Sequence, residues 1–340
     1  MPMTSRHLAR PDLRLGARMV RRTPLRYDEG ADAALDRPAH VRGGSGLALV
    51  RGRRYVVQDD ANFNAVIDAT GAVRAVTLPA GHAGLRQFDD ARGNKKFRLD
   101  LEACTVAPGP DGAAVLVAFG SGSGKRRDRV VLLEGVESAA PEVVVRHAEA
   151  LYDMLQATTS FAGSELNIEG AVYRDGRIWL FQRGNGAPRR GLKPVNATCT
   201  LDWPRLAHYL RRSDDVEPPA PEDVTQYALG EMGGTPLGFT DATAWGDGFL
   251  FTAAAERSPD AERDGPVTGS VLGTLQPGGE RAYTTIVDED GAPFDGKVEG
   301  LAPAVGHEGH VQVIVDQDDP TAPAVLCLVE LTGPWPARDG

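Results

Sequence analysis

Short apolar runs separated by tight turns recur along the whole chain. After Ser45 an apolar run ends at the turn Arg51-Gly52, and after Glu169 two apolar runs flank the turn Asp175-Gly176. The same frame recurs with turns at Asp111-Gly112, Asp247-Gly248 and Glu308-Gly309. Asp-Gly between two apolar runs is typical of a β-hairpin, because glycine accepts the positive φ of a tight turn. The pattern therefore predicts a series of hairpins, usually extended by a third apolar strand.

A short phrase with one polar residue among small or apolar ones precedes each predicted hairpin. Lys297-Val298-Glu299-Gly300-Leu301 is the clearest copy, and Asn167-Ile168-Glu169-Gly170-Ala171 is a near copy. The polar anchors of the five copies are 57 to 72 residues apart and are Ser45, Glu102, Glu169, Asp241 and Glu299. Multi-strand units at so long a period are typical of propeller blades. We therefore predict an all-β fold, a five-bladed β-propeller.

The last copy supplies strands near 299–304, 311–316 and 324–330, one strand short of a four-stranded blade. Residues 18–27 can form a strand, and its addition to the last blade would close the ring and cover open sheet edges. We therefore expect residues 1–17 to be a flexible basic arm and residues 18–335 to be a single propeller domain. Between 141 and 161, apolar residues at three- and four-residue spacing predict one amphipathic helix.

Composition agrees with a turn-rich β-protein and narrows the list of partners. The chain has 340 residues with 40 Gly and 24 Pro, a profile that does not suit a helical bundle. A net charge of −10 argues against a general nucleic-acid binder, and no apolar run is long enough to cross a membrane. Three cysteines, an odd number in or near predicted strands, favour buried free thiols. We expect a soluble, cytoplasmic monomer that binds a small anionic molecule.

The anchors are candidates for a metal site. If each anchor begins the innermost strand of its blade, pseudo-symmetry brings the five side chains together around the central channel. Several carboxylates a few ångströms apart repel one another, and a cation would relieve that repulsion. Oxygen-only ligands suit Ca²⁺ better than Zn²⁺. We therefore predict one calcium ion in the central channel, bound by Ser45, Glu102, Glu169, Asp241 and Glu299. The alternative is a set of carboxylates with raised pKa that bond to water or arginine.

Residues just after the second strand of each hairpin leave the sheets on one side and should gather at one mouth of the channel. We predict that catalytic acids there are Asp59, Asp60 and Asp318. Basic residues of the same segments can hold phosphate or carboxylate, and the predicted substrate-binding residues are Arg183, Arg257 and Lys125. The polar connection 81–96 is a second place where a ligand could bind. Solvated loop charges that pair with each other are the alternative for any one of these residues.

The anchor phrases carry a resemblance to known families. Ser45-Gly46-Leu47, Leu166-Asn167-Ile168-Glu169-Gly170 and Lys297-Val298-Glu299-Gly300-Leu301 resemble phrases of an uncharacterised bacterial propeller family akin to phytase-like esterases. Their order, with Val57-Gln58-Asp59-Asp60 after the first anchor, is also similar to the calcium-activated nucleotidases, or apyrases, which are five-bladed propellers. The second resemblance implies that Ser45, Glu102, Glu169 and Glu299 are calcium ligands. Asp241 stands where that family has a serine.

Two functional hypotheses follow. In the first, the protein is a metal-dependent hydrolase, with calcium at the mouth, that cleaves a phosphoester or phosphoanhydride of a phosphorylated or otherwise anionic small molecule. In the second, it is a non-catalytic propeller whose calcium is structural and whose mouth binds a ligand or a protein partner. The recurrence of acids and bases at one mouth favours the enzyme, although a propeller fold does not define a reaction.

Overall fold

Strands make up most of the regular structure in the computed structural model, which describes residues 6–124, 126–138, 140–212, 216–263, 265–277 and 281–338. Four-stranded antiparallel meanders follow one another along the described chain. The first meander consists of β4 (Gly44–Val50), β5 (Arg53–Gln58), β6 (Phe63–Ile67) and β7 (Val73–Thr77). The second consists of β8 (Leu101–Pro108), β9 (Ala114–Gly120), β10 (Arg129–Glu134) and β11 (Glu142–His147). The predicted all-β class is confirmed.

The later meanders follow the same order. The third consists of β12 (Ile168–Arg174), β13 (Arg177–Gln182), β14 (Asn196–Asp202) and β15 (Glu222–Ala228). The fourth consists of β17 (Thr235–Trp245), β18 (Gly248–Glu256), β19 (Val267–Leu275) and β20 (Arg281–Val287), with the short β16 (Glu231–Met232) before it. The fifth contains β21 (Lys297–Pro303), β22 (His310–Asp316) and β23 (Val325–Thr332).

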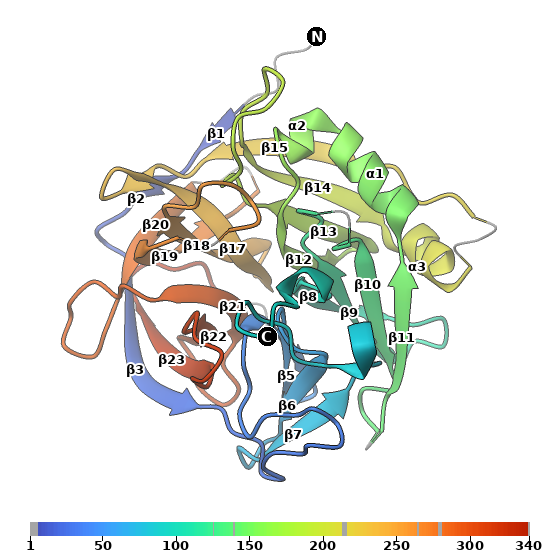
Figure 1. Ribbon diagram of the computed structural model, residues 1–340. Coiled ribbons are helices and arrows are strands. Elements are labelled where there is room, and N and C mark those ends of the chain that lie inside the picture. Colours follow the sequence, from blue (N-terminus) through green and yellow to red (C-terminus); the bar gives the residue numbers. More distant parts are fainter. Residues whose placement is uncertain are drawn as a thin grey trace.

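The first strands of the meanders contact one another in sequence. β4 packs against β8, β8 against β12, β12 against β17, β17 against β21, and β21 against β4. Figure 1 shows the meanders arranged around this central group, with the colours following the chain around the molecule. The fold is therefore propeller-like. Buried apolar side chains fill the space between neighbouring meanders, as in the cluster of Phe181, Phe239 and Phe251, where Phe239 meets each of the others edge to face.

The amino-terminal segment pairs with meanders that are distant in sequence. β3 (Gly16–Pro24) runs antiparallel to β23, with Gly16 opposite Thr332 and Pro24 opposite Val325. The strand expected over 18–27 therefore starts and ends slightly earlier. Met19 in this strand is fully buried, because its side chain enters the apolar core of the fifth meander. β3 also meets β20 through a short parallel pairing.

Residues 6–17 differ from the flexible arm that the sequence analysis expected. β1 (Arg6–Leu8) pairs in parallel with β15, and β2 (Arg10–Pro11) pairs in parallel with β20. The backbone groups of these two outer strands would otherwise lack a neighbour on that side, which is the physical reason for the added pairing. Residues 1–5 of the expected arm lie outside the described residues.

Helices are short and lie in the connections. They are η1 (His82–Gly84), η2 (Lys95–Phe97), α1 (Glu149–Ala157), α2 (Thr159–Ala162) and α3 (Trp203–Arg211). α1 confirms the amphipathic helix predicted within 141–161, since Leu151, Tyr152 and Leu155 are buried on one face. The first part of that connection is instead β11, the outer strand of the second meander. Among the described residues, no helix combines the length and the apolar character that crossing a membrane requires.

The predicted hairpin turns use glycine at positive φ. Gly52, Gly112, Gly176 and Gly309 have φ of 81°, 80°, 76° and 65°, as expected for tight turns. In the fourth meander Gly246 takes this role, with φ of 52°, in place of the expected Gly248. Cys104, Cys199 and Cys327 are buried free thiols, as predicted.

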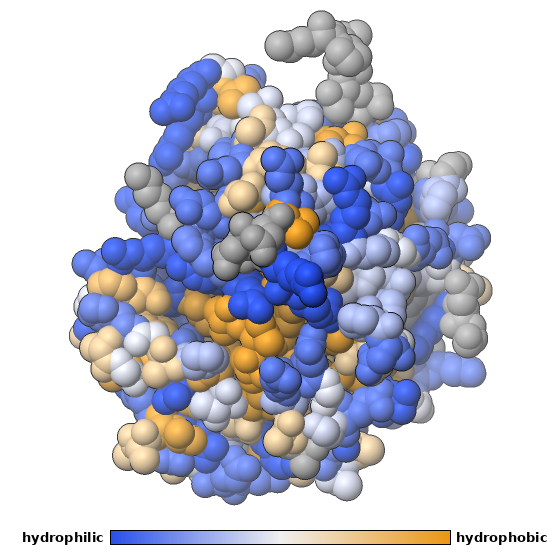
Figure 2. Space-filling model, turned by 90° about the vertical axis from the view of Figure 1, so that its right-hand side faces the viewer, coloured by the Kyte–Doolittle hydropathy of each residue, from blue (hydrophilic) through white to orange (hydrophobic). Residues whose placement is uncertain are grey.

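The face of the molecule shown in Figure 2 is mostly hydrophilic. Figure 2 shows the side of the molecule on which β11 lies in Figure 1, and hydrophilic side chains there surround one apolar hollow. β11 is the edge strand of its sheet, and its valines Val143, Val144 and Val145 are only half-buried.

Candidate functional site

One polar side chain lies at the same structural position in the first strand of each meander. The pairing between the first and second strands shifts by one residue at this position, which makes it a β-bulge. The bulged residues are Ser45, Glu102, Glu169, Thr240 and Glu299. Four of the five predicted anchors are therefore structurally equivalent. In the fourth meander the equivalent residue is Thr240, one position before the predicted Asp241.

This one-residue difference changes what the Asp241 side chain contacts. Its carboxylate accepts hydrogen bonds from the backbone N–H groups of Ala242, at 2.7 Å, and Leu301, at 2.6 Å. Burial raises the pKa of Asp241 well above its ordinary value, and these backbone donors offset part of that rise. Thr240 is fully buried and donates a 3.0 Å hydrogen bond to the hydroxyl of Thr252. Neither side chain therefore has the uncompensated charge that a cation would relieve.

Ser45 also uses its hydroxyl within the sheets, donating a short hydrogen bond to the carbonyl oxygen of Leu101 on the next first strand. Glu169 has two partners. Asn167 Nδ2 donates to Glu169 Oε1 at 2.7 Å, and Arg183 Nη1 lies 3.3 Å from the same oxygen. Burial raises the pKa of Glu169, and Arg183 offsets much of the shift.

Glu299 is compensated by a lysine of its own strand. Lys297 Nζ lies 2.8 Å from Glu299 Oε1, in an ion-pair contact that lacks hydrogen-bond alignment. Lys297 Nζ also lies 3.8 Å from Glu256 Oε2, and that same oxygen accepts a 2.5 Å hydrogen bond from Arg183 Nη2. Burial raises the pKa of Glu299 well above its ordinary value, whereas Lys297 lowers it. Two buried cations thus neutralise much of the acidic charge on this side of the axis.

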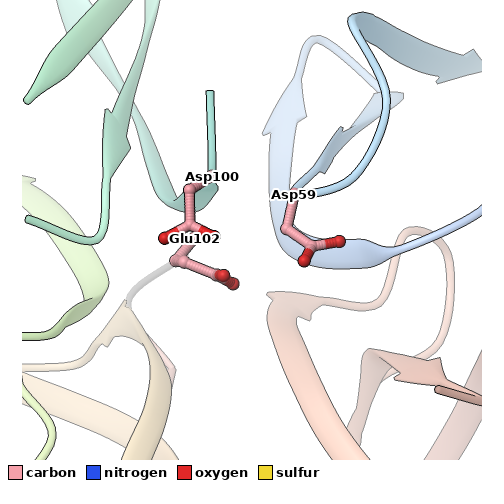
Figure 3. A group of neighbouring side chains, drawn as sticks. All are labelled: Asp59, Asp100 and Glu102. Carbon is pink, nitrogen blue, oxygen red and sulfur yellow. The ribbon is translucent and has the colours of Figure 1, made fainter. Parts of the chain in front are cut away.

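Glu102 is the exception among the predicted metal ligands. Its carboxylate makes no hydrogen bond or ion pair with any described residue. One of its oxygens lies within 4.8 Å of carboxylate oxygens of Asp59 and Asp100, which themselves lie within that distance of each other. Figure 3 shows Asp59 on a separate segment of the chain from Asp100 and Glu102. Burial, followed by repulsion from Asp59 and Asp100, raises the pKa of Glu102 well above its ordinary value.

Two arginines compensate Asp59 and Asp100 in part. Arg98 Nη1 donates a short hydrogen bond to Asp59 Oδ2, and Arg98 Nε forms an ion pair with Asp100 Oδ1. Arg127 Nη1 lies 3.2 Å from Asp100 Oδ2. Asp100 is 1 % exposed and has a φ of 57°, in the left-handed region that only glycine adopts freely. The backbone is therefore strained where this carboxylate enters the cluster, a feature that is common at functional sites.

An acidic pocket of about 390 Å³ adjoins the cluster through Asp59. Acids of the first and fifth meanders and basic residues of the connection after β7 line it together. The lining residues are Gly43, Asp59, Asp60, Phe88, Asp89, Asp90, Ala91, Lys95, Arg98, Asp316, Asp318, Asp319 and Pro320. The predicted catalytic acids Asp59, Asp60 and Asp318 thus share one pocket, and the connection 81–96 contributes to the same pocket.

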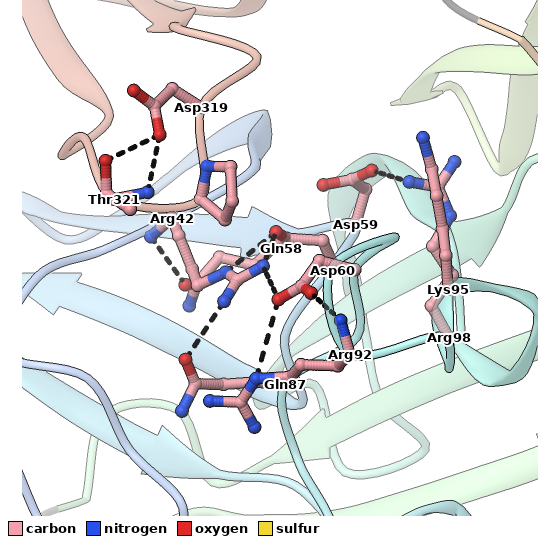
Figure 4. Close-up of polar contacts among 12 residues, drawn as sticks. Arg42, Gln58, Asp59, Asp60, Gln87, Arg92, Lys95, Arg98, Asp319 and Thr321 are labelled. Carbon is pink, nitrogen blue, oxygen red and sulfur yellow. Dashed lines mark hydrogen bonds and ion pairs between the residues drawn. The ribbon is translucent and has the colours of Figure 1, made fainter.

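Asp60 is held in place by a buried arginine. Arg42 Nε and Nη2 lie 2.7 and 2.5 Å from Asp60 Oδ2, and Figure 4 shows these two side chains together. Arg42 Nη2 also lies 3.1 Å from Asp89 Oδ2. Asp60 Oδ1 is buried without a hydrogen bond. Gly43 is required here, because a Cβ at this position would collide with Asp59 Oδ1 and lie 2.5 Å from Asp60 Oδ1.

Asp316, at the end of β22, is an acid of the acidic pocket whose pKa is raised into the neutral range. Burial raises its pKa from 3.8 to about 7, repulsion from Asp318 adds to the rise, and Lys297 opposes it. A carboxyl group that titrates near neutral pH can both accept and donate a proton. Sequence reasoning grouped Asp316 with its neighbours but did not select it, because its burial is not visible in the sequence.

The predicted substrate-binding arginines lie elsewhere. Arg183 and Arg257 line a second pocket of about 370 Å³ between the third and fourth meanders. The second pocket shares none of its lining residues with the acidic pocket. Lys125, the third predicted member of this group, lies outside the described residues.

Several basic and amide residues of the site were missed by the sequence analysis. Four of them each precede an anchor by two to four residues and each contact a carboxylate near the axis. They are Arg42, Arg98, Asn167 and Lys297. A cationic or amide side chain that recurs just before the anchor phrase is the sequence signal that identifies this group.

The chain belongs to a family of unknown function, DUF6929, whose model matches residues 40–331. None of the curated proteins is similar enough to count as a match. Solved structures that resemble the chain include Myxococcus xanthus glutaminyl cyclase, at 9% identity and a TM-score of 0.44, covering 97% of this chain and 100% of that one.

Two further structures extend the comparison. A GH43 β-1,3-galactosidase, BT3683, has 10% identity and a TM-score of 0.48, covering 90% of this chain and 93% of that one. A streptogramin B lyase has 11% identity and a TM-score of 0.38, covering 92% and 98%. These likenesses assign no activity to the chain. Nothing in the comparisons supports the resemblance to phytase-like esterases or apyrases, which stays an expectation.

Proposed function

We propose that the protein is a five-bladed β-propeller and a metal-dependent hydrolase that acts on a small anionic molecule in the acidic pocket. The five successive meanders and the cyclic contacts of their first strands support the blade count. The pairing of β3 with β23 supports closure of the ring by the amino-terminal strand. Closure matters for function, because the acidic pocket is built from the first and last blades and requires them to stay side by side.

The observation that carries the proposal is the carboxylate of Glu102, which has no cationic partner among the described residues and lies within 4.8 Å of Asp59 and Asp100 oxygens. Three converging carboxylates with one left uncompensated suit a hard divalent cation such as Ca²⁺, which accepts oxygen ligands in flexible geometry. The proposed cation ligands are therefore Asp59, Asp100 and Glu102, in place of the predicted five-residue set. Of the original set, Ser45 and Asp241 use their oxygens within the sheets, and Glu169 and Glu299 have cationic partners.

The residues of the acidic pocket account for the other parts of a hydrolytic reaction. A cation bound by the three carboxylates would polarise an anionic group and favour attack on it. Asp316, with a pKa of about 7, takes the proton of the attacking water and returns it to the leaving group. Arg42 orients Asp60 at the wall of the pocket, and Lys95 and Arg98 supply positive charge toward the substrate. A phosphoester or phosphoanhydride is the substrate that this combination of charges suits best.

The test separates the cation site from the chemistry. Thermal unfolding is measured after EDTA treatment and again with added Ca²⁺, for the wild type and for Glu102→Gln, with Asp318→Asn as the control on the pocket rim. Calcium should raise the melting temperature of the wild type and of Asp318→Asn but not of Glu102→Gln, since a ligand that binds only the folded state stabilises it. No response to calcium in the wild type would refute the cation site.

Turnover is then measured with a panel of phosphoesters and phosphoanhydrides. Asp316→Asn should lose activity by about a hundredfold or more while keeping the calcium response, because general acid–base catalysis contributes roughly 10²–10⁴-fold. Activity that is equal in Asp316→Asn and the wild type would exclude Asp316 as the proton carrier.

The non-catalytic alternative also has an observation in its favour. Arg183 and Lys297 already neutralise buried acids near the axis, an arrangement that suits a rigid scaffold. In that case calcium would stabilise the fold, but no substrate of the panel would be turned over, and Asp316→Asn would alter only stability.

A further inference from the structure

We propose that the second pocket, between the third and fourth meanders, is a binding site for the oxyanion group of a small ligand, either a carboxylate or a phosphate. The pocket holds about 370 Å³, a volume within the range of small-molecule sites. Its walls come from the segments that follow β13 and β18 and from the start of β17. The proposal concerns a site separate from the acidic pocket and does not depend on a bound cation.

The first argument is an unsatisfied donor on a buried arginine. Arg183 is 2 % exposed, and its Nη1 and Nη2 atoms are engaged by Glu169 and Glu256. Its Nε–H is buried and has no hydrogen-bond partner. Buried donors are nearly always satisfied in native proteins, so each exception calls for a missing partner. An oxygen atom of a ligand in the second pocket would satisfy this N–H.

Gly238 packs directly against the Arg183 side chain. A Cβ at Gly238 would lie 2.8 Å from Arg183 Cγ and 3.3 Å from Arg183 Nε, and both residues line the second pocket. A side chain at position 238 would therefore displace Arg183, so the glycine allows Arg183 to keep its place in the wall of the pocket.

The other polar groups of the pocket are also donors. Ser258 Oγ is buried without a hydrogen-bond partner. Asn185 Oδ1 accepts a 3.2 Å hydrogen bond from Asn167, which directs the amide oxygen away and leaves the amide NH₂ for an acceptor. Arg257 lies exposed at the rim, where its Nε donates to Thr235 Oγ1 at 3.1 Å and its Nη2 donates to the carbonyl oxygen of Gly233 at 3.5 Å.

The one acid in the lining does not oppose an anion. Glu256 Oε1 accepts a 2.6 Å hydrogen bond from the backbone N–H of Gly265, and Glu256 Oε2 accepts from Arg183 Nη2. Both oxygens are thus engaged. What remains for a ligand is the Nε–H of Arg183, the guanidinium group of Arg257 at the rim, a hydroxyl and an amide. This donor set matches the acceptor oxygens of a carboxylate or phosphate.

The test uses calcium-free protein in EDTA, so that its result is independent of the proposed hydrolytic site. Isothermal titration calorimetry is carried out with inorganic phosphate and, separately, with succinate, which distinguishes the two sources of the oxyanion. The variants are Arg257→Gln and Ser258→Ala, neither of which breaks the buried Arg183–Glu256 pair. Arg263→Gln is the matched control, because Arg263 is exposed and forms an ion pair with Asp260 nearby, outside the lining of the second pocket.

We expect at least one of the two anions to bind the wild type and Arg263→Gln equally. Arg257→Gln and Ser258→Ala should each weaken binding by about tenfold, the loss of one strong hydrogen bond to an anion. The proposal is overturned if neither anion binds the wild type, or if both bind Arg257→Gln and Ser258→Ala as tightly as the control.

Discussion

The carboxylate of Asp241 accepts a 2.6 Å hydrogen bond from the backbone N–H of Leu301, which lies on the first strand of the next meander. Asp241 Oδ1 also accepts from its own neighbour Ala242. The side chain is 1 % exposed, so this bond is shielded from water. A polar residue that first looked like a metal ligand therefore connects two adjacent sheets.

Replacement of Asp241 should destabilise the fold whether or not calcium is present. Asp241→Ala leaves two buried N–H groups without acceptors, and we expect the free energy of unfolding to fall by about 2–5 kcal/mol. Asp241→Asn keeps one acceptor oxygen and should cost about 1–3 kcal/mol. Urea unfolding measures both, with exposed Asp247→Asn as a control that should change little. If calcium stabilises the wild type but not Asp241→Asn, Asp241 is a metal ligand after all.

The repeated architecture was visible in the sequence because it depends on local patterns. Apolar runs and turn glycines such as Gly52 and Gly176 act over a few residues, so they predicted the hairpins directly. The position of the fourth anchor was not visible. Thr240 and Asp241 are adjacent and both polar, and only the strand register tells which of them occupies the bulge.

The ion-pair partners of the charged residues also could not be predicted from the sequence. Arg98 lies 39 residues from Asp59, and Arg183 lies 73 residues from Glu256, yet both pairs are in direct contact. Such pairs depend on how neighbouring sheets face each other. For that reason the acids and arginines that were expected at one mouth belong to two pockets. Of the five predicted metal ligands, Glu102 alone has the surroundings expected for a metal ligand.

The stability of the fold should depend on the protonation of Asp316. Its pKa is raised from 3.8 to about 7, so between these values the native state holds a proton that the unfolded chain releases. The stability that this group contributes therefore falls as the pH rises from about 4 to about 7. Above about pH 7 this contribution is absent. Asp316→Asn should match the wild type near pH 4 and exceed it near pH 8. Parallel pH profiles of stability for the two proteins would argue against the raised pKa.

Removal of the amino-terminal strand should destabilise the whole domain. β3 pairs with β23 along its length, and Met19, Leu25 and Tyr27 are buried. Deletion of residues 1–30 removes this pairing and exposes the edge of β23, and we expect the melting temperature to fall by at least about 10 °C. Deletion of residues 1–5 is the control and should leave the melting temperature unchanged. An unchanged melting temperature after the longer deletion would contradict closure of the ring by β3.

Removal of either partner of the Arg183–Glu256 ion pair should lower the free energy of unfolding substantially. Arg183 Nη2 lies 2.5 Å from Glu256 Oε2, and both side chains are almost fully buried. Burial alone would lower the pKa of Arg183, but attraction to Glu169 and Glu256 raises it above its ordinary value, so the arginine stays charged.

Arg183→Met leaves these carboxylates buried without their main cation, and we expect a loss of about 3–5 kcal/mol in the free energy of unfolding. Glu256→Gln removes one of the stranded charges, so the double variant should be more stable than the sum of the single changes predicts. A double-mutant cycle in urea measures this coupling. Because Lys297 also approaches Glu256, the coupling should be smaller in a Lys297→Met background if the three residues form one network. Additive effects of Arg183→Met and Glu256→Gln would mean that the two side chains do not stabilise each other.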